Sequence, residues 1–481
     1  MRRRGWHGLV CRQIPDPAIA GFFYSTHILA FIEKMADGVR DFMFGQNNVN
    51  FSTPMRYRNS LLALIAILPL SFVLASGAPE ARDGQRATER PPLSLRIDPG
   101  FKREELPADG RIWYDRLSAA IKNSSGNKDI TDKASKNDIH SYSRPMNNYL
   151  IGVLHALRVT GDKSLLDEVD RVTSLMRAQL KDSSIVVKVP PGETVAPVAD
   201  GFLNWVRAPR TPLYDGTDVH AMDEMLTHST LAEVAYTFQV NGNVDPKYAE
   251  RTKFWKDYLL KHFEAKWRIR NEKPQGKFME NTLIHVYIAW TRYHYYMNLL
   301  TGQQWYRDEA ERRAKVFAAQ MIPMNNNTAY IWSHRVVGER EGDKLMIAQP
   351  TTYARYTAVS AADLAFEKFS IFTPEFMQKM AAGIREFIMD NGATDFAGDI
   401  AGDVQRANLP KAQTLHPRES LTKFAAGNFP ELGAWDSTGK ITSVSQEVYR
   451  KLEKNSENPR GVHLPSGILT AVMVQNGALR K

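Results

Sequence analysis

The chain has 481 residues, of which 43% are hydrophobic, 10% aromatic and 24% charged. This composition is typical of a globular protein with a large buried core, and it excludes a disordered or fibrous protein. The net charge of +9 favours an anionic partner. We do not expect nucleic acid to be that partner, because the chain has no patch dense in lysine and arginine.

An export signal is predicted at residues 55–77. This segment begins with a methionine and two nearby arginines, continues through an apolar run at 61–74, and ends in small residues. The order is typical of a secretory signal peptide, and the run is shorter than the roughly 20 residues of a membrane span. We therefore interpret residues 1–54, which hold the only cysteine, as lying upstream of the true start. We expect a bacterial periplasmic or secreted protein that begins near Ala78, with no disulfide and no membrane contact after cleavage.

Helical patterns predominate after a polar lead-in at 78–110 and extend through the predicted catalytic domain, residues 111–481. Three stretches repeat one pattern, in which an apolar helix ends at a glycine turn and a more charged helix follows. These stretches are 147–180, 231–263 and 283–321. Further helices are predicted at 353–368 and 374–391, and short strands in "SSIVVKVP" and "NTAYIWSHRVV".

The repeated pairs predict an all-α fold in which apolar helices lie inside and amphipathic helices lie outside. Long polar loops at 181–217 and 391–436 make the repeat irregular. This irregularity favours an α/α toroid, an incomplete or closed ring of helical hairpins, over an open solenoid. Long loops on such a ring are expected to build a substrate cleft.

The stretch "ENTLIHVYIAWTRYHYYMNLLTG" carries unusually many polar residues for an apolar helix. On a helix, Asn281, His285, Arg292, Tyr295 and Tyr296 fall within an arc of about 100°. We interpret this stripe as the lining of a central cleft. The alternative is that each residue is a buried polar group satisfied by a neighbouring helix.

A second stretch places His220, Glu224 and His228 four residues apart. The two histidines would lie about 12 Å apart along a helix, which is too far for one metal ion. We therefore expect no metal and no other cofactor. His228 is predicted to be a cleft residue, and His220 is a candidate substrate-binding residue.

Other candidate substrate-binding residues are Asn147, Asn148, Trp205, His334, Arg335, Tyr353, Arg355 and Tyr356. Aromatic rings that stack on sugars, together with guanidinium groups that pair with carboxylates, suit an anionic polysaccharide. The alternatives are helix capping for the two asparagines and core packing for Trp205.

β-Elimination from a uronic-acid polymer would use these residue types. Asn, His or Arg side chains would neutralise the uronate carboxylate, and a Tyr or His would transfer protons at C5 and O4. With "NNYL", "LTHS" and "NTLIHVYIAWTRYHYY", the chain resembles the α/α-toroid lyases of polysaccharide lyase family 38, which act on alginate or glucuronan. This resemblance implies a toroid enzyme with Tyr296 or Tyr295 as base and acid. It also implies His228 or His285 as partner, and Asn148 and Arg292 as carboxylate neutralisers.

Two alternatives remain open. A glycoside hydrolase of the unsaturated uronyl hydrolase type would need catalytic carboxylates. The candidates for that role are Asp215, Asp218, Asp223, Asp395 and Asp399. A non-catalytic protein that binds acidic sugars would need only the aromatic and arginine residues. The sequence does not predict an oligomeric state.

Overall fold

The computed structural model describes residues 94–125, 128–185, 198–206, 221–271, 283–336, 348–402, 416–421, 429–455 and 461–477. The predicted signal peptide, the segment before it and residues 78–93 of the lead-in lie outside these ranges. The described residues belong to one compact unit. None of the helices in these ranges combines the length and hydropathy that a membrane span requires.

An inner set of helices is buried on almost every side. It consists of α6 (Asn147–Thr160), α8 (Ala221–Val240), α11 (Ile284–Thr301), α13 (Thr351–Phe366) and α18 (His463–Gln475). An outer set covers it, namely α3 (Ala108–Ser125), α7 (Lys163–Arg177), α9 (Pro246–Tyr258), α12 (Gln304–Ala318), α14 (Pro374–Gly383) and α17 (Lys440–Lys454).

Shorter elements complete the fold. The short helices are η2 (Arg103–Glu105), α4 (Lys128–Ala134), α5 (Ile139–Ser141), η3 (Tyr142–Met146), η4 (Leu259–Glu264), α10 (Ala265–Asn271), η6 (Ile384–Ile388) and η7 (Pro430–Trp435). The strands β1 (Lys181–Ile185) and β2 (Val198–Asn204) form one antiparallel hairpin, and β3 (Met321–Met324) and β4 (Ala329–Trp332) form another.

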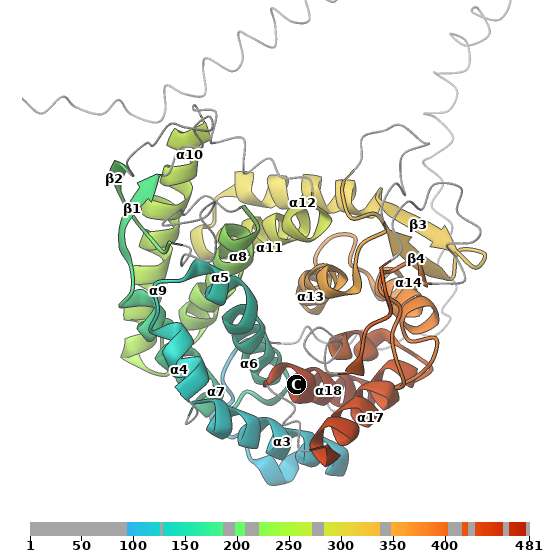
Figure 1. Ribbon diagram of the computed structural model, residues 1–481. Coiled ribbons are helices and arrows are strands. Elements are labelled where there is room, and N and C mark those ends of the chain that lie inside the picture. Colours follow the sequence, from blue (N-terminus) through green and yellow to red (C-terminus); the bar gives the residue numbers. More distant parts are fainter. Residues whose placement is uncertain are drawn as a thin grey trace, which may run out of the picture. The chain divides into compact units, whose positions relative to one another are not determined.

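The inner helices form a closed ring (Figure 1). Around this ring α6 contacts α8, α8 contacts α11, α11 contacts α13, and η7 joins α13 to α18, which returns to α6. Each inner helix also packs against an outer partner that is adjacent in the sequence. The chain is therefore all-α with an α/α-toroid arrangement, which confirms the predicted fold class.

The predicted hairpins begin and end where glycine and capping residues place them. Gly161 and Gly302 end α6 and α11 with φ angles of 70° and 71°, a left-handed conformation that glycine adopts without strain. Asp162 then caps α7 by accepting a hydrogen bond from the backbone N–H of Ser164 at 2.9 Å. Local sequence therefore sets the hairpin boundaries.

The predicted elements differ from the structure mainly at their ends. The helix predicted at 374–391 is α14 continued by the π-helical turn η6, and it ends at Ile388. The two predicted strands are confirmed in part as β1 and β4. Their partners β2 and β3 were not predicted, because neither has a clear alternating pattern.

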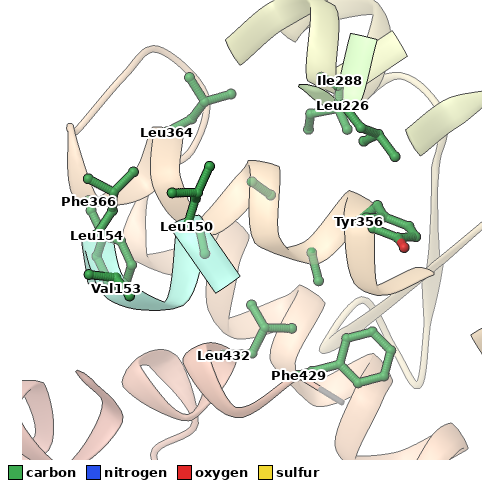
Figure 2. Packing of buried hydrophobic residues seen from close by; sticks show 14 of the residues in the cluster. Leu150, Val153, Leu154, Leu226, Ile288, Tyr356, Leu364, Phe366, Phe429 and Leu432 are labelled. Carbon is green, nitrogen blue, oxygen red and sulfur yellow. The ribbon is translucent and has the colours of Figure 1, made fainter. Parts of the chain in front are cut away.

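The ring is packed by aliphatic side chains from helices that are distant in the sequence. Figure 2 shows Leu150 of α6, Leu226 of α8, Ile288 of α11, Leu364 of α13 and Leu432 of η7 in one buried cluster. Burial of such side chains stabilises a fold by roughly 1.5–3 kcal/mol each. This apolar core therefore fixes the relative positions of the inner helices, which also carry the polar residues of the site.

Small residues let α18 close the ring. A Cβ atom at Gly152 of α6 would lie 3.2 Å from the Cα of His463, and a Cβ atom at Gly467 would lie 2.3 Å from the Pro430 ring. The two glycines thus allow α18 to approach α6 on one side and η7 on the other. This contact fixes the first residue of α18, His463, beside the second turn of α6.

Candidate active site

A cavity lies where the inner helices meet, and every helix of the inner set contributes to its wall. The lining residues are Asn147, Asn148, Ile151, Leu226, Arg292, Arg355, Tyr356, Val359, Ser360 and His463. Their polar groups are amide, guanidinium, hydroxyl and imidazole groups, with no carboxylate among them. Such a lining can donate hydrogen bonds to an anion but offers it no like charge.

Arg292 reaches the cavity from α11 and is held by two buried carboxylates. Its guanidinium pairs with Glu233 of α8, and its Nε lies 2.7 Å from Oδ2 of Asp363 on α13. Burial alone would lower the pKa of Arg292, but Asp363 and Glu233 outweigh burial and hold the pKa above its ordinary value. The charge of Arg292 is therefore compensated within the protein.

Thr230 connects Arg292 to the asparagines of α6. Arg292 Nη1 donates to the Thr230 hydroxyl at 3.1 Å, and that hydroxyl donates to Oδ1 of Asn147 at 2.5 Å. With its oxygen engaged, the Asn147 amide retains its NH2 group as a donor. Asn148 is half-buried at the same cavity. Neither asparagine caps a free helix end, because the residue before α6 is itself helical.

Arg355 is the second arginine of the cavity, and its electrostatic environment differs from that of Arg292. It is 3% exposed, and burial lowers the pKa of its guanidinium despite the opposing effects of Tyr356 and Glu431. Burial therefore outweighs the attraction of the surrounding negative groups. An anion that entered the cavity would offset this cost, because it would supply negative charge beside a desolvated cation.

Tyr356 joins the cavity to a cluster of rings. Its ring centroid lies 5.4 Å from Arg355 Cζ and 6.4 Å from the ring of His285. His285 stacks against Tyr353 at 4.9 Å and against His334 at 5.6 Å. The structure thus brings together four candidate residues, His285, His334, Tyr353 and Tyr356, from three separate segments of the sequence.

The two histidines of this ring cluster are uncharged at neutral pH. Burial and the neighbouring His334 hold the pKa of His285 well below its ordinary value, and Nδ1 of His285 lies 3.2 Å from the amide of Gln349. Burial, followed by Arg335 and His416, lowers the pKa of His334 to about 4. His285 does not line the cavity, and Tyr356 is the member of the ring cluster that does.

Tyr296 does not share the cavity with Arg292, in contrast to the predicted stripe. Its side chain is fully buried, and its hydroxyl accepts a hydrogen bond from Arg158 Nη2 at 2.5 Å. Burial raises the pKa of Tyr296 well above its ordinary value, although Arg158 opposes the rise. The Arg158 guanidinium also pairs with Glu233 and Glu367 at 2.7 and 2.5 Å. Tyr296 therefore belongs to an internal ion network, and its predicted catalytic role gains no support from its position.

Tyr295 and His228 also lie away from the cavity lining. The hydroxyl of Tyr295 donates to Glu367 at 3.3 Å, and its ring packs against Phe369. His228 is fully buried, with its Nε2 3.0 Å from the Tyr258 hydroxyl and its ring stacked on Phe263 at 3.9 Å. His228 was predicted to be a cleft residue. The structure places it between α8 and the outer helices, so that prediction of its location is wrong.

The remaining candidates are dispersed. Trp205 is buried and donates its indole N–H to the Met176 carbonyl, so it packs in the core and does not form a platform for sugar. Arg335 is exposed beyond β4. His220 and Asn281 lie outside the described residues, as do Asp215 and Asp218 of the hydrolase alternative.

The described aspartates of that alternative do not meet at the cavity. Asp223 accepts a hydrogen bond from the Ser143 hydroxyl, Asp395 pairs with Arg418, and Asp399 accepts from the backbone N–H of Ala401. None of the three lines the cavity. Within the described part of the chain they do not supply the facing pair of carboxylates that glycoside hydrolysis uses.

Sequence analysis missed His463 and the carboxylates that hold Arg292. His463 opens the apolar helix α18, as Asn147 opens α6. This shared pattern of a polar residue at the start of an inner helix was a usable signal. Glu233 and Asp363 had no such signal, because each lies in the interior of its helix and not at the start.

No protein-family model matches the chain, and no curated protein matches it. A solved structure described as a possible member of the GH105 family from Klebsiella pneumoniae subsp. pneumoniae MGH 78578 is similar over 76% of this chain and 93% of that chain. The TM-score is 0.39 and the sequence identity 13%. A similarity this low does not define a function. The fold and cavity define an α/α-toroid protein with a buried cationic site, and the resemblance to polysaccharide lyase family 38 stays a prediction.

Proposed function

We propose that this protein is a polysaccharide lyase that cleaves a uronic-acid polymer, such as alginate, polymannuronate or glucuronan, by β-elimination at the cavity of the inner helices. One observation carries the proposal. The cavity combines a desolvated arginine, Arg355, with two amide side chains, a tyrosine hydroxyl and an imidazole. These are the groups that a β-elimination next to a carboxylate requires.

Neutralisation of the uronate carboxylate falls to Arg355 with Asn148. The C5 proton of a uronate is weakly acidic because the carboxylate next to it is negative, so donors and positive charge must stabilise the anion formed on proton removal. Arg355 can supply two parallel N–H donors to a carboxylate, and Asn147 and Asn148 can supply amide donors. Arg292 keeps these groups in place through Thr230 and Asn147.

Proton transfer falls to Tyr356 and His463. His463 takes the C5 proton, and the electrons of the C5–H bond form the C4=C5 double bond as the C4–O4 bond breaks. Tyr356 donates its proton to the departing O4, and the proton held by His463 then restores the tyrosine. Arg355, beside the Tyr356 ring, stabilises the transient phenolate. The products are a 4,5-unsaturated uronate and a new reducing end, whose anomeric hydroxyl contains the former O4 and the proton from Tyr356, so all protons are accounted for.

The test is incubation of the purified protein with polymannuronate, polyguluronate and glucuronan. A lyase produces new reducing ends together with the ultraviolet absorbance of a 4,5-unsaturated uronate. New reducing ends without that absorbance would replace this proposal with the hydrolase. Binding without new ends on any of these polymers would replace it with a non-catalytic acidic-sugar protein.

A further inference from the structure

Glu431 lies directly behind His463 and is not used by the mechanism above. It is the second residue of η7, its side chain is fully buried, and its Oε2 lies 3.8 Å from Nε2 of His463. Neither carboxylate oxygen has a hydrogen-bond partner on another described residue. A buried carboxylate without such partners is costly, so the fold bears a cost to keep this group beside the imidazole.

The approach of η7 to α18 places Glu431 there. At Gly467, one turn along α18 from His463, an added Cβ atom would lie 3.1 Å from the backbone nitrogen of Glu431 and still closer to Pro430. Any side chain larger than hydrogen would separate the two elements. The position of Glu431 relative to His463 is therefore set by backbone packing.

The charged groups that face Glu431 come from every inner element around it. His463 faces it from α18, Arg355 and Asp363 act on it from α13, and His155 acts on it from α6. Burial, the largest effect, raises the pKa of Glu431 to about 7, while His155 and Arg355 oppose the rise. Both protonation states of Glu431 are thus accessible near neutral pH.

We propose that Glu431 is a positioning residue that orients the imidazole of His463 toward the cavity and stabilises the imidazolium formed when His463 accepts a proton. The inference rests on the proposed lyase function, because that function gives His463 the C5 proton to accept. Glu431 itself forms no bond to substrate. In its ionised state it places a negative charge behind the base, as a carboxylate does behind a catalytic histidine in other enzymes.

Three variants test this on the polymer that the protein cleaves. Glu431→Gln keeps the shape and removes the charge, so we expect kcat to fall at least about tenfold, the equivalent of one pKa unit. The acidic limb of the pH profile of kcat/KM should move to lower pH, and KM should change little. Glu431→Asp, which keeps a charge, should retain more activity than Glu431→Gln. Glu447→Gln, an exposed carboxylate on α17, serves as the matched control and should behave as wild type.

A binding measurement separates this inference from the proposed function. D-Glucuronate has no glycosidic bond at O4 and so binds without cleavage. Calorimetry at pH 7 in two buffers of different ionisation heat should show uptake of a fraction of a proton on binding, because a new anion favours protonation of the His463–Glu431 pair. Glu431→Gln should take up less.

If the wild-type protein cleaves none of the uronate polymers, the lyase proposal is refuted. If proton uptake on glucuronate binding is nevertheless smaller in Glu431→Gln than in wild type, the pairing of Glu431 with His463 still holds. A folded Glu431→Gln protein with wild-type kcat, pH profile and proton uptake would overturn the inference.

Discussion

Two buried polar regions lie inside the ring, the internal ion network around Arg158 and the cavity around Arg355. They shift the pKa of a buried arginine in opposite directions. In the internal network, Arg158 faces Glu233 and Glu367, and Arg292 extends from the network to the cavity wall while paired with Glu233 and Asp363. The negative groups of this network hold the pKa of each arginine above its ordinary value. In the cavity, burial lowers the pKa of Arg355. All three arginines are buried, so burial alone does not distinguish a structural arginine from a ligand-binding one. The balance between desolvation and local carboxylates separates a structural arginine from one suited to an external anion.

A matched pair of tyrosine variants tests the difference between the two regions most directly. Tyr356→Phe removes the hydroxyl at the cavity, so kcat should fall by about 10²–10⁴-fold with little change in stability. Tyr296→Phe removes the hydroxyl that accepts from Arg158, so the free energy of unfolding should fall by about 1.5–3 kcal/mol while kcat stays near wild type. Assays of product absorbance and urea unfolding on both variants measure this. The opposite result would return the catalytic role to Tyr296, as predicted from the sequence.

Variants of Arg158 and Arg355 test the difference between the ion network and the cavity through the free energy of unfolding. Arg158→Met leaves Glu233 and Glu367 without their shared cation, and breaking such a buried pair should cost about 3–5 kcal/mol of unfolding free energy. Arg355→Met should cost less than about 1 kcal/mol, because it removes a charge that burial disfavours, but should abolish measurable binding of an oligouronate. Denaturant unfolding and calorimetric titration provide the two readouts. Equal destabilisation by both variants would show that the two regions do not differ in the way described.

The unfolding free energy should depend on pH because of Glu431, which is buried beside the cavity. Its folded pKa of about 7 exceeds its ordinary value of 4.5, so the folded state holds more protons than the unfolded state between these values. The unfolding free energy therefore holds its full contribution from Glu431 below pH 4.5. It loses about 3 kcal/mol in all as the pH rises from 4.5 through 7. Glu431→Gln lacks this loss. Relative to wild type, it should gain unfolding free energy between pH 5 and pH 8, whereas Glu447→Gln should follow wild type throughout.

The arrangement of helical pairs could be predicted because its signals are local. Glycines at 161 and 302 end apolar helices, and Asp162 caps the helix that follows the first of them, so each hairpin is encoded within about 35 residues of sequence. The partner strands and the ring closure were less visible. They depend on contacts between segments that no periodic pattern connects.

The candidate site was predictable only in part, and Arg292 and Tyr296 show why. A helical projection gives the direction of a side chain around the axis, but not its depth along the axis. The two residues share a direction, yet four residues correspond to a rise of about 6 Å, enough to separate the cavity from the ion network beneath it. Depth was decided by Glu233 and Asp363 on neighbouring helices. The sequence of α11 holds no information about them.

The closure of the ring by α18 has a consequence for how the chain reaches its native state. The helix that completes the inner ring is encoded some 300 residues after α6, against which it packs. A contact this distant in sequence is entropically slow to form, and a chain still emerging from the ribosome cannot make it. The side of α6 that α18 covers therefore stays exposed until α18 itself has been synthesised. The cavity, with His463 as one wall, is therefore complete only after α18 has packed against α6.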